Sequence, residues 1–210
     1  MGFKGSQVRI LSLRPDKSII LGNRFLNGGI MKYSVKELKE QAISLGFSNA
    51  SELNIASLVF MPEVRQMCNS DLCHSFNKNW MCPPAIGTLE SAAERVKEYN
   101  FGMIVQTTAV MEDEFDYETI QSTEKKHKDN FFKLITELKK NYSYILPMSA
   151  GTCSICSKCT YPDQPCRFPD KAIGSMESYG LWVSKVCEMS SIPYYYGKNT
   201  LTFTSCYLLR

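Results

Sequence analysis

The sequence predicts an α/β fold: one sandwich-like domain of mixed sheet and flanking helices, with cysteine-rich loops. After residue 100 the apolar pattern alternates between strand-like and helix-like segments, which is the order expected when helices pack on the faces of a sheet. Nine cysteines fall largely in polar, irregular stretches between these elements. A chain of 210 residues has room for such a domain with a core of its own.

The first thirty residues differ in composition from the remainder. They hold five Lys/Arg against one Asp and only two short apolar runs, 8–13 and 19–21. We therefore expect two parts: an N-terminal extension over 1–30, either non-native or due to an upstream start, and a metal-binding domain over 31–210.

Signals for individual elements follow from Met31 onward. Ser34 and Glu37 form a capping box at the start of a helix that Gly46 ends. Helical spacing of apolar residues predicts further helices over 88–99, 117–141 and 175–189. Runs of β-branched and apolar residues predict strands over 54–60, 101–111, 144–148, 193–196 and 201–208. In the long helix, the charged stretch 124–129 is expected to face solvent, which makes His127 inert.

Four cysteines occur close together in the sequence, namely Cys153, Cys156, Cys159 and Cys166. The C-x2-C-x2-C run with a later cysteine beside proline is typical of bacterial-type iron–sulfur ferredoxins. Structural zinc sites usually consist of two separate Cys-x2-Cys pairs, so a third cysteine at the same gap favours a cubane. The spacing predicts a [4Fe-4S] cluster, and zinc is the less favoured alternative.

A second group, Cys68, Cys73 and Cys82, lies upstream and indicates a second cluster. In two-cluster ferredoxins the fourth cysteine of a run ligates the other cluster. By that rule Cys166 completes the upstream group, and the first cluster takes its fourth ligand from elsewhere. Cys206 is the better candidate for that ligand, and Cys187 is the spare thiol.

A competing arrangement makes Cys166 the fourth ligand of its own loop. The upstream trio would then carry a cluster with one open iron, a Lewis acid able to bind a small substrate. His74, Arg65 and the tyrosines 194–196 would bound that site. The sequence leaves both arrangements open. In either one, Trp80 and the prolines after Cys82 would shield the upstream cluster from water, and Arg65, Lys78 and Arg167 would offset cluster charge.

Composition excludes several other functions. The net charge of +3 is too small and dispersed for a nucleic-acid interface. Dinucleotide-binding, phosphate-loop and serine-hydrolase motifs are all missing from the sequence. An odd number of cysteines at ligand spacing, without an export signal or a run of about 20 apolar residues, predicts a reducing, cytoplasmic setting.

The chain resembles a family of small prokaryotic proteins described as predicted metal-binding, the domain of unknown function 2284. The matching motifs are Arg65-x-Met67-Cys68 with Cys73, Asn79-Trp80-x-Cys82-Pro83-Pro84, the run from Cys153 to Pro169, Ser175-Met176-Glu177-x-Tyr179-Gly180, Pro193 to Gly197, and Thr200 to Phe203 with Cys206. They extend from about Met31 to Arg210. The resemblance implies an anaerobe-type iron–sulfur or metal-binding protein whose reaction is unassigned.

Three functions remain on these grounds. The first is a protein with two [4Fe-4S] clusters that transfers single electrons to or from a redox protein partner. The second is an enzyme in which an open iron activates a small substrate. The third is a zinc-stabilised interaction module, in which metal binding is coupled to folding.

Overall fold

Four strands form one sheet with the order β1-β2-β4-β3 in the computed structural model, which describes residues 33–210. The predicted extension 1–30 lies outside the described residues. The strands are β1 (Asn49–Glu52), β2 (Phe101–Val110), β3 (Ile145–Met148) and β4 (Thr200–Leu209), and the helices are α1 (Val35–Ser44), α2 (Pro62–Asn69), α3 (Leu89–Val96), α4 (Tyr117–Leu138) and α5 (Val183–Met189). Two short 3₁₀ turns, η1 (Ile55–Ser57) and η2 (Glu177–Tyr179), complete the elements.

The long strands β2 and β4 are the centre of the sheet. They pair antiparallel along their whole length, from Phe101 opposite Leu209 to Val110 opposite Thr200. β3 pairs with the other edge of β4, so β2, α4 and β3 form a βαβ unit that β4 splits. The predicted α/β class is confirmed. The pairings are all antiparallel among the described strands, because β4 lies between the two strands that the crossover would otherwise pair in parallel.

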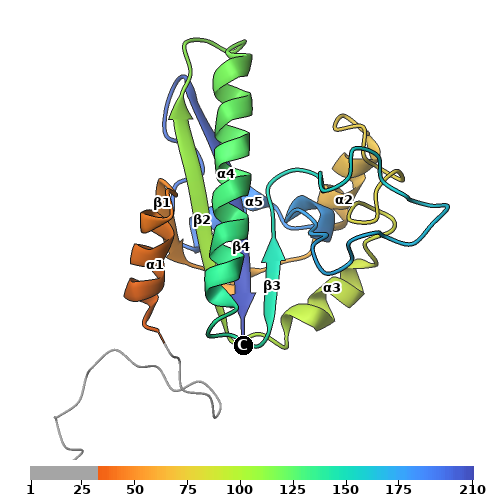
Figure 1. Cartoon of the computed structure of the whole chain (residues 1–210), viewed down its shortest axis with the longest axis horizontal. Coiled ribbons are helices and arrows are strands. Elements are labelled where there is room, and N and C mark those ends of the chain that lie inside the picture. The colour runs from red at the N-terminus through yellow and green to blue at the C-terminus, as the bar shows by residue number, and fades with distance from the viewer. Residues whose placement is uncertain (1–32) are drawn as a thin grey trace, which may run out of the picture.

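Helices cover both faces of this sheet. On one face α1 and α4 contribute Leu38, Phe131 and Leu134 to a core that contains Met103 and Tyr207. The other face has its own core, built by α3, α5 and η2 with the alternate residues of β2 and β4. Figure 1 shows α4 running along the front of the sheet, with α5 behind it. Residues at period two along β2 therefore serve two cores, which explains its nearly continuous apolar sequence.

The first strand lies earlier than predicted. β1 is Asn-Ala-Ser-Glu, a polar edge strand with no apolar alternation, whereas the apolar residues of 54–60 fall on η1 and the segment after it. Ile55, Leu58 and Phe60 pack against the core from there. The prediction of a strand over 54–60 was wrong: these side chains are partly buried by packing, and Phe60 alone pairs, in an isolated bridge with Leu181.

The helix predicted over 175–189 is interrupted. Gly180 adopts φ +90° and separates η2 from α5, so the chain turns before Val183. The strand predicted over 193–196 is also missing from the described elements. The hydroxyl of Tyr196 instead donates to the buried Oε1 of Gln106 at 2.6 Å, which fixes this segment as a loop against the sheet.

The segments that carry the two cysteine groups lie together to one side of the sheet, beyond β3 (Figure 1). α2 and the loop after it form one part of this region. The loop that follows β3 forms the other. The sheet and its two cores thus act as a platform, and the irregular segments extend from it.

Candidate metal centre

The loop after β3 brings four cysteines to one cavity. The N–H of Ser149 donates to the carbonyl of Gly174 at 2.9 Å, which closes the base of a long loop between them. Cys153, Cys156, Cys159 and Cys166 all line a cavity of about 260 Å³ between this loop and residues 74–81, and each is partly exposed. The guanidinium of Arg167 donates to the carbonyl of Lys158 at 2.9 Å and connects the end of the cysteine run, after Cys166, to its middle, before Cys159.

The upstream trio lines a second cavity, of about 290 Å³. Cys68 lies in the last turn of α2, a helix missed at the sequence level, which begins with Pro62 at its first position. The chain then winds tightly through three left-handed residues, Asp71, His74 and Asn77. Cys73 is exposed in this winding, and Cys82 is buried at its end.

Hydrogen bonds hold the two loops against each other. The Nδ2 of Asn79 donates to the carbonyl of Cys153 at 3.0 Å, and the Nε1 of Trp80 donates to the carbonyl of Gln164 at 3.1 Å. The hydroxyl of Tyr161 donates to Asn77 at 2.8 Å, and its ring lies edge-on to that of Trp80. The two cavities consequently adjoin, and Thr152 lines both.

The electrostatics of the thiols reflect this convergence. The pKa of Cys82 is raised to about 12, first by burial and then by the neighbouring thiols of Cys73, Cys68, Cys153 and Cys159. Burial and then Cys73 likewise raise the pKa of Cys68. Thiolates from both groups would therefore repel one another here, and a cationic centre between them would relieve that repulsion.

The four-cysteine loop also presents unused hydrogen-bond donors. In the described chain, the backbone N–H groups between Ala150 and Asp163 donate no hydrogen bond to another protein group, apart from Pro162, which has no N–H. Such donors are costly to leave without partners unless water or a bound group accepts from them. Hydrogen bonds to the sulfurs are one of the means by which proteins set the potential of an iron–sulfur cluster.

The cations expected to offset cluster charge are already engaged with protein groups. Arg65 donates to the carbonyl of Gly87 at 3.0 Å, and burial lowers the pKa of its guanidinium. Its Nε is buried without a partner in the described structure. Lys78 pairs with Asp71 at 2.6 Å. Arg65 is nonetheless electrostatically coupled to Cys68, so one cation does lie beside the upstream trio.

Two of the nine cysteines lie apart from both cavities. Cys206 is fully buried in β4, opposite Ile104 and Met148, and Cys187 is fully buried in α5. Both belong to the core on the far side of the sheet from α4. The structure does not bring Cys206 to the four-cysteine loop, and Cys166 lines the cavity of its own loop.

The remaining candidates divide as follows. His74 is exposed on the rim of the four-cysteine cavity. The tyrosines 194–196 line none of the cavities beside the cysteines in the described residues, and Tyr196 is bound to Gln106 instead. The expectation that His127 faces solvent was wrong: the residue is 1% exposed, because the helix turns it toward the sheet between Phe47 and Phe203.

Comparison with models of protein families identifies the family of this chain. A family model described as "Predicted metal-binding protein (DUF2284)" matches residues 51–209. The chain belongs to the DUF2284 family. This confirms the resemblance noted in the sequence, and both cysteine groups fall inside the matched residues. Searches of curated proteins and of solved structures gave no match.

Within this DUF2284 chain, the cysteines are arranged around cavities and not around a point. No three His, Cys, Asp or Glu side chains of the described residues stand close enough to hold a single ion. All nine cysteines are free thiols. None of the helices among residues 33–210 is long and apolar enough to cross a membrane.

Asn79 belongs to the site, although its residue type gave no reason to expect this from the sequence. It is almost fully buried, and its side chain bonds both to Cys153 and to the N–H of Met81. A neutral amide gives no ligand signal of its own. Only its place in the family motif, three residues before Cys82, pointed to it.

Proposed function

We propose that the protein binds two iron–sulfur clusters and transfers single electrons to a redox protein partner. The observation that carries this proposal is the placement of seven cysteines around two adjoining cavities. Cys153, Cys156, Cys159 and Cys166 would hold one [4Fe-4S] cluster with a complete set of thiolates. Cys68, Cys73 and Cys82 would hold three corners of a second.

The residues present fit a cluster better than a single zinc ion. A zinc ion with Zn–S bonds of about 2.3 Å needs its thiolates drawn tightly around one point. Here the cysteines surround a cavity of about 260 Å³, which is several times the roughly 30 Å³ that one water molecule occupies in the liquid. The free backbone N–H groups of the loop add donors suited to cluster sulfides.

When bound, the clusters would supply reversible one-electron chemistry, and the chain would hold and shield them. Trp80, which bonds to Gln164 across the two loops, and the buried Pro83 would shield the clusters from water. Arg65 adds a positive charge near Cys68. At the rim of the upstream cavity, Met67 and Leu72 are strongly exposed and offer a partner protein an apolar surface close to that cluster.

Anaerobic purification followed by iron and acid-labile sulfide assays tests the proposal. We expect a brown protein with two clusters per chain, and Cys156→Ser and Cys73→Ser should each remove one of them. Cys187→Ser is the matched control, because that thiol lies in the core, and it should retain both clusters. A colourless protein with stoichiometric zinc would instead identify the zinc-stabilised interaction module.

A specific observation favours one alternative, an enzyme with an open iron. The upstream cavity has three cysteines and no fourth, and its remaining lining includes the apolar Val64, Leu72 and Phe76. A cluster held there would leave one iron for a small ligand. Electron paramagnetic resonance of the reduced protein with and without ethanethiol separates the two functions. A changed signal from the upstream cluster shows that ethanethiol binds an open iron, and it supports the enzyme. An unchanged signal shows that a ligand other than cysteine already closes the fourth corner, and it supports electron transfer.

A further inference from the structure

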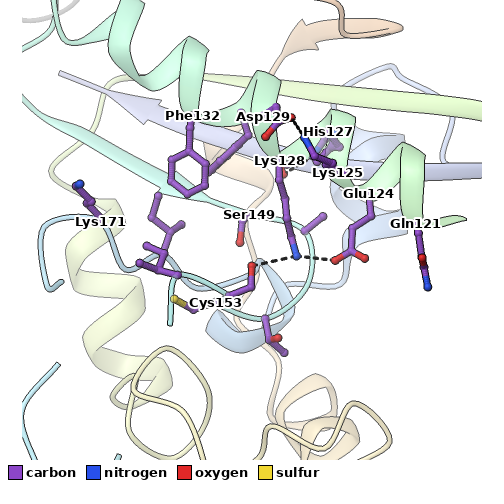
Figure 2. A pocket seen from close by; sticks show the side chains of 17 residues that line it. Gln121, Glu124, Lys125, His127, Lys128, Asp129, Phe132, Ser149, Cys153 and Lys171 are labelled. Atoms are coloured by element: carbon purple, nitrogen blue, oxygen red, sulfur yellow. Dashed lines mark hydrogen bonds and ion pairs between the residues drawn. The ribbon is translucent and has the colours of Figure 1, made fainter. Parts of the chain in front are cut away.

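A third cavity, of about 390 Å³, opens between α4 and the loop that leads from β3 to the first cysteine. Figure 2 shows Lys128 and Phe132 of α4 on one side and Ser149 and Cys153 of the loop on the other. Cys153 lines both this cavity and the four-cysteine cavity. The volume lies near the lower end of the roughly 300–1,000 Å³ that ligand pockets occupy.

The cavity ends in a buried polar pair. The Nε2 of His127 lies 2.7 Å from the Oγ of Ser205, and its Nδ1 lies 2.8 Å from the Oγ1 of Thr107. Both His127 and Ser205 line the cavity, and both are almost completely buried. Burial lowers the pKa of His127 to about 4, so the imidazole is neutral at physiological pH and the pair adds no charge.

The rim carries an excess of one positive charge. Two lysines of α4 are neutralised locally, because Lys125 pairs with Asp129 and Lys128 pairs with Glu124. Lys171 lines the cavity from the returning half of the cysteine loop, and in the described structure it has no acidic partner. An anion bound here would meet an ammonium group that no carboxylate already holds.

The walls between the rim and the buried pair are apolar. Phe132 is 42% exposed on α4, and Ile155 and Ile173 line the cavity from the loop. An exposed phenyl ring beside two isoleucines suits the hydrocarbon or aromatic part of a small molecule. The hydroxyl of Thr152, also in the lining, has no partner among the described residues and is free to bond a ligand.

We propose that this cavity binds a small organic acid as its monoanion, with the carboxylate at Lys171 and the apolar body against Phe132. The inference deepens the proposed function, since an acid bound here lies against Cys153 and therefore beside the cluster that the four cysteines would hold. Binding itself depends on the cavity and its charges, and not on the identity of the metal.

Isothermal titration calorimetry with the anaerobically purified full chain tests this inference. The probes are benzoate, butyrate and the uncharged benzamide. At least one of the two acids should bind, and benzoate should bind about tenfold tighter than benzamide, because only the carboxylate can pair with Lys171. Lys171→Gln should remove that preference, and Lys171→Arg should keep it. Lys36→Gln, an exposed lysine on α1, is the matched control and should change nothing.

Two results would overturn the inference: no binding of either acid, or equal binding of benzoate and benzamide. Phe132→Ala gives a second readout that does not depend on charge, and it should weaken both aromatic probes alike. Iron content and circular dichroism are measured on the same samples. Iron without acid binding contradicts only this inference, and acid binding without iron contradicts only the proposed function.

Discussion

At the scale of single residues, Asn79 is the link between the two cysteine groups. Its Nδ2 reaches the carbonyl of Cys153 in one loop, and its Oδ1 accepts from the N–H of Met81 in the other. Because the side chain is almost fully buried, water cannot replace either bond. The relative position of the two cavities therefore depends in part on this amide, beside the bonds that Trp80 and Tyr161 make between the same loops.

Replacing this amide should loosen the site. We expect Asn79→Ala to lower the free energy of unfolding by about 1–3 kcal/mol, since it leaves the partly buried carbonyl of Cys153 and N–H of Met81 without these partners. We also expect iron to be lost faster to a chelator. Gln66→Ala, which truncates an exposed amide on α2, is the control and should behave like the native chain. Equal rates of iron loss would show that Asn79 does not align the loops.

His127 should make stability depend on pH. Its pKa is about 4 in the folded chain against about 6.5 for the exposed group, so the unfolded chain binds the proton more readily. The neutral, buried imidazole therefore contributes on the order of 3 kcal/mol to the free energy of unfolding above pH 6.5, and this contribution is lost as the pH falls through 4. Urea unfolding at pH 7 and pH 5 measures this. His127→Gln should lose the dependence, whereas His74→Gln, at an exposed position, should retain it.

The cysteines that line the two cavities were predictable from sequence at this scale, and residues whose position depends on packing were not. Thiol chemistry and spacing pointed to all seven cysteines that line the two cavities. Spacing could not show that Cys206 lies apart from these seven, because its burial in β4 depends on its register opposite Ile104. The burial of His127 was likewise hidden, because its sequence neighbours on α4 are charged while its own side chain faces the sheet.

At the scale of elements, Gly180 decides how the segment before α5 is built. A left-handed residue ends η2, and the carbonyl of Gly180 accepts from the N–H of Met61 at 2.8 Å, just before α2. This bond connects the platform to the helix that carries Cys68. Helical spacing alone predicted one continuous helix here. The periodicity of apolar residues does not reveal that one residue, Gly180, has a left-handed backbone conformation.

Two glycine variants separate backbone strain from crowding. Gly180 and Gly197 both have positive φ, of 90° and 112°, so alanine should cost about 1–2 kcal/mol of strain at either. A Cβ at Gly180 would also lie 2.5 Å from Leu89 and 3.3 Å from the carbonyl of Met61, whereas nothing lies within 4 Å at Gly197. Gly180→Ala should therefore lower the thermal midpoint clearly more than Gly197→Ala. Equal midpoints would mean that Leu89 moves aside freely.

Long elements were predictable because their patterns are strong and local. α4, β2 and β4 fall close to their predicted positions, since each carries a long apolar repeat or a capping residue. β1 and α2 were missed for a common reason. A four-residue polar edge strand and a short helix in a cysteine-rich stretch draw their stability from the neighbours that they contact, which no local pattern records.

At the scale of the whole molecule, the two cores and the cysteine region are separate in space. The apolar clusters lie on the two faces of the sheet, and the cysteine loops extend beyond β3 (Figure 1). The fold of the platform should therefore survive removal of the metal. The order of the strands in the sheet could not be predicted from the sequence, because it depends on contacts between residues far apart in the chain.

Metal removal gives the corresponding prediction. After iron is chelated, we expect the far-ultraviolet circular dichroism to stay close to that of the loaded protein, since the sheet and α4 need no metal. Trypsin should then cut within the cysteine loop, at Lys158 or Arg167, much faster than in the loaded protein. Mass spectrometry of the fragments measures this. Complete loss of the dichroism signal on chelation would show instead that the metal holds the entire fold.

The central position of β4 has a consequence for biosynthesis. This strand is made after all the others described here, yet it pairs with both β2 and β3. While β4 is still inside the ribosome, β3 has no strand to pair with among those described here, and the base of the cysteine loop is not yet packed against the sheet. Cofactor insertion would then have to follow translation of β4, and a nascent chain stalled before Thr200 would expose both sets of thiols to oxidation.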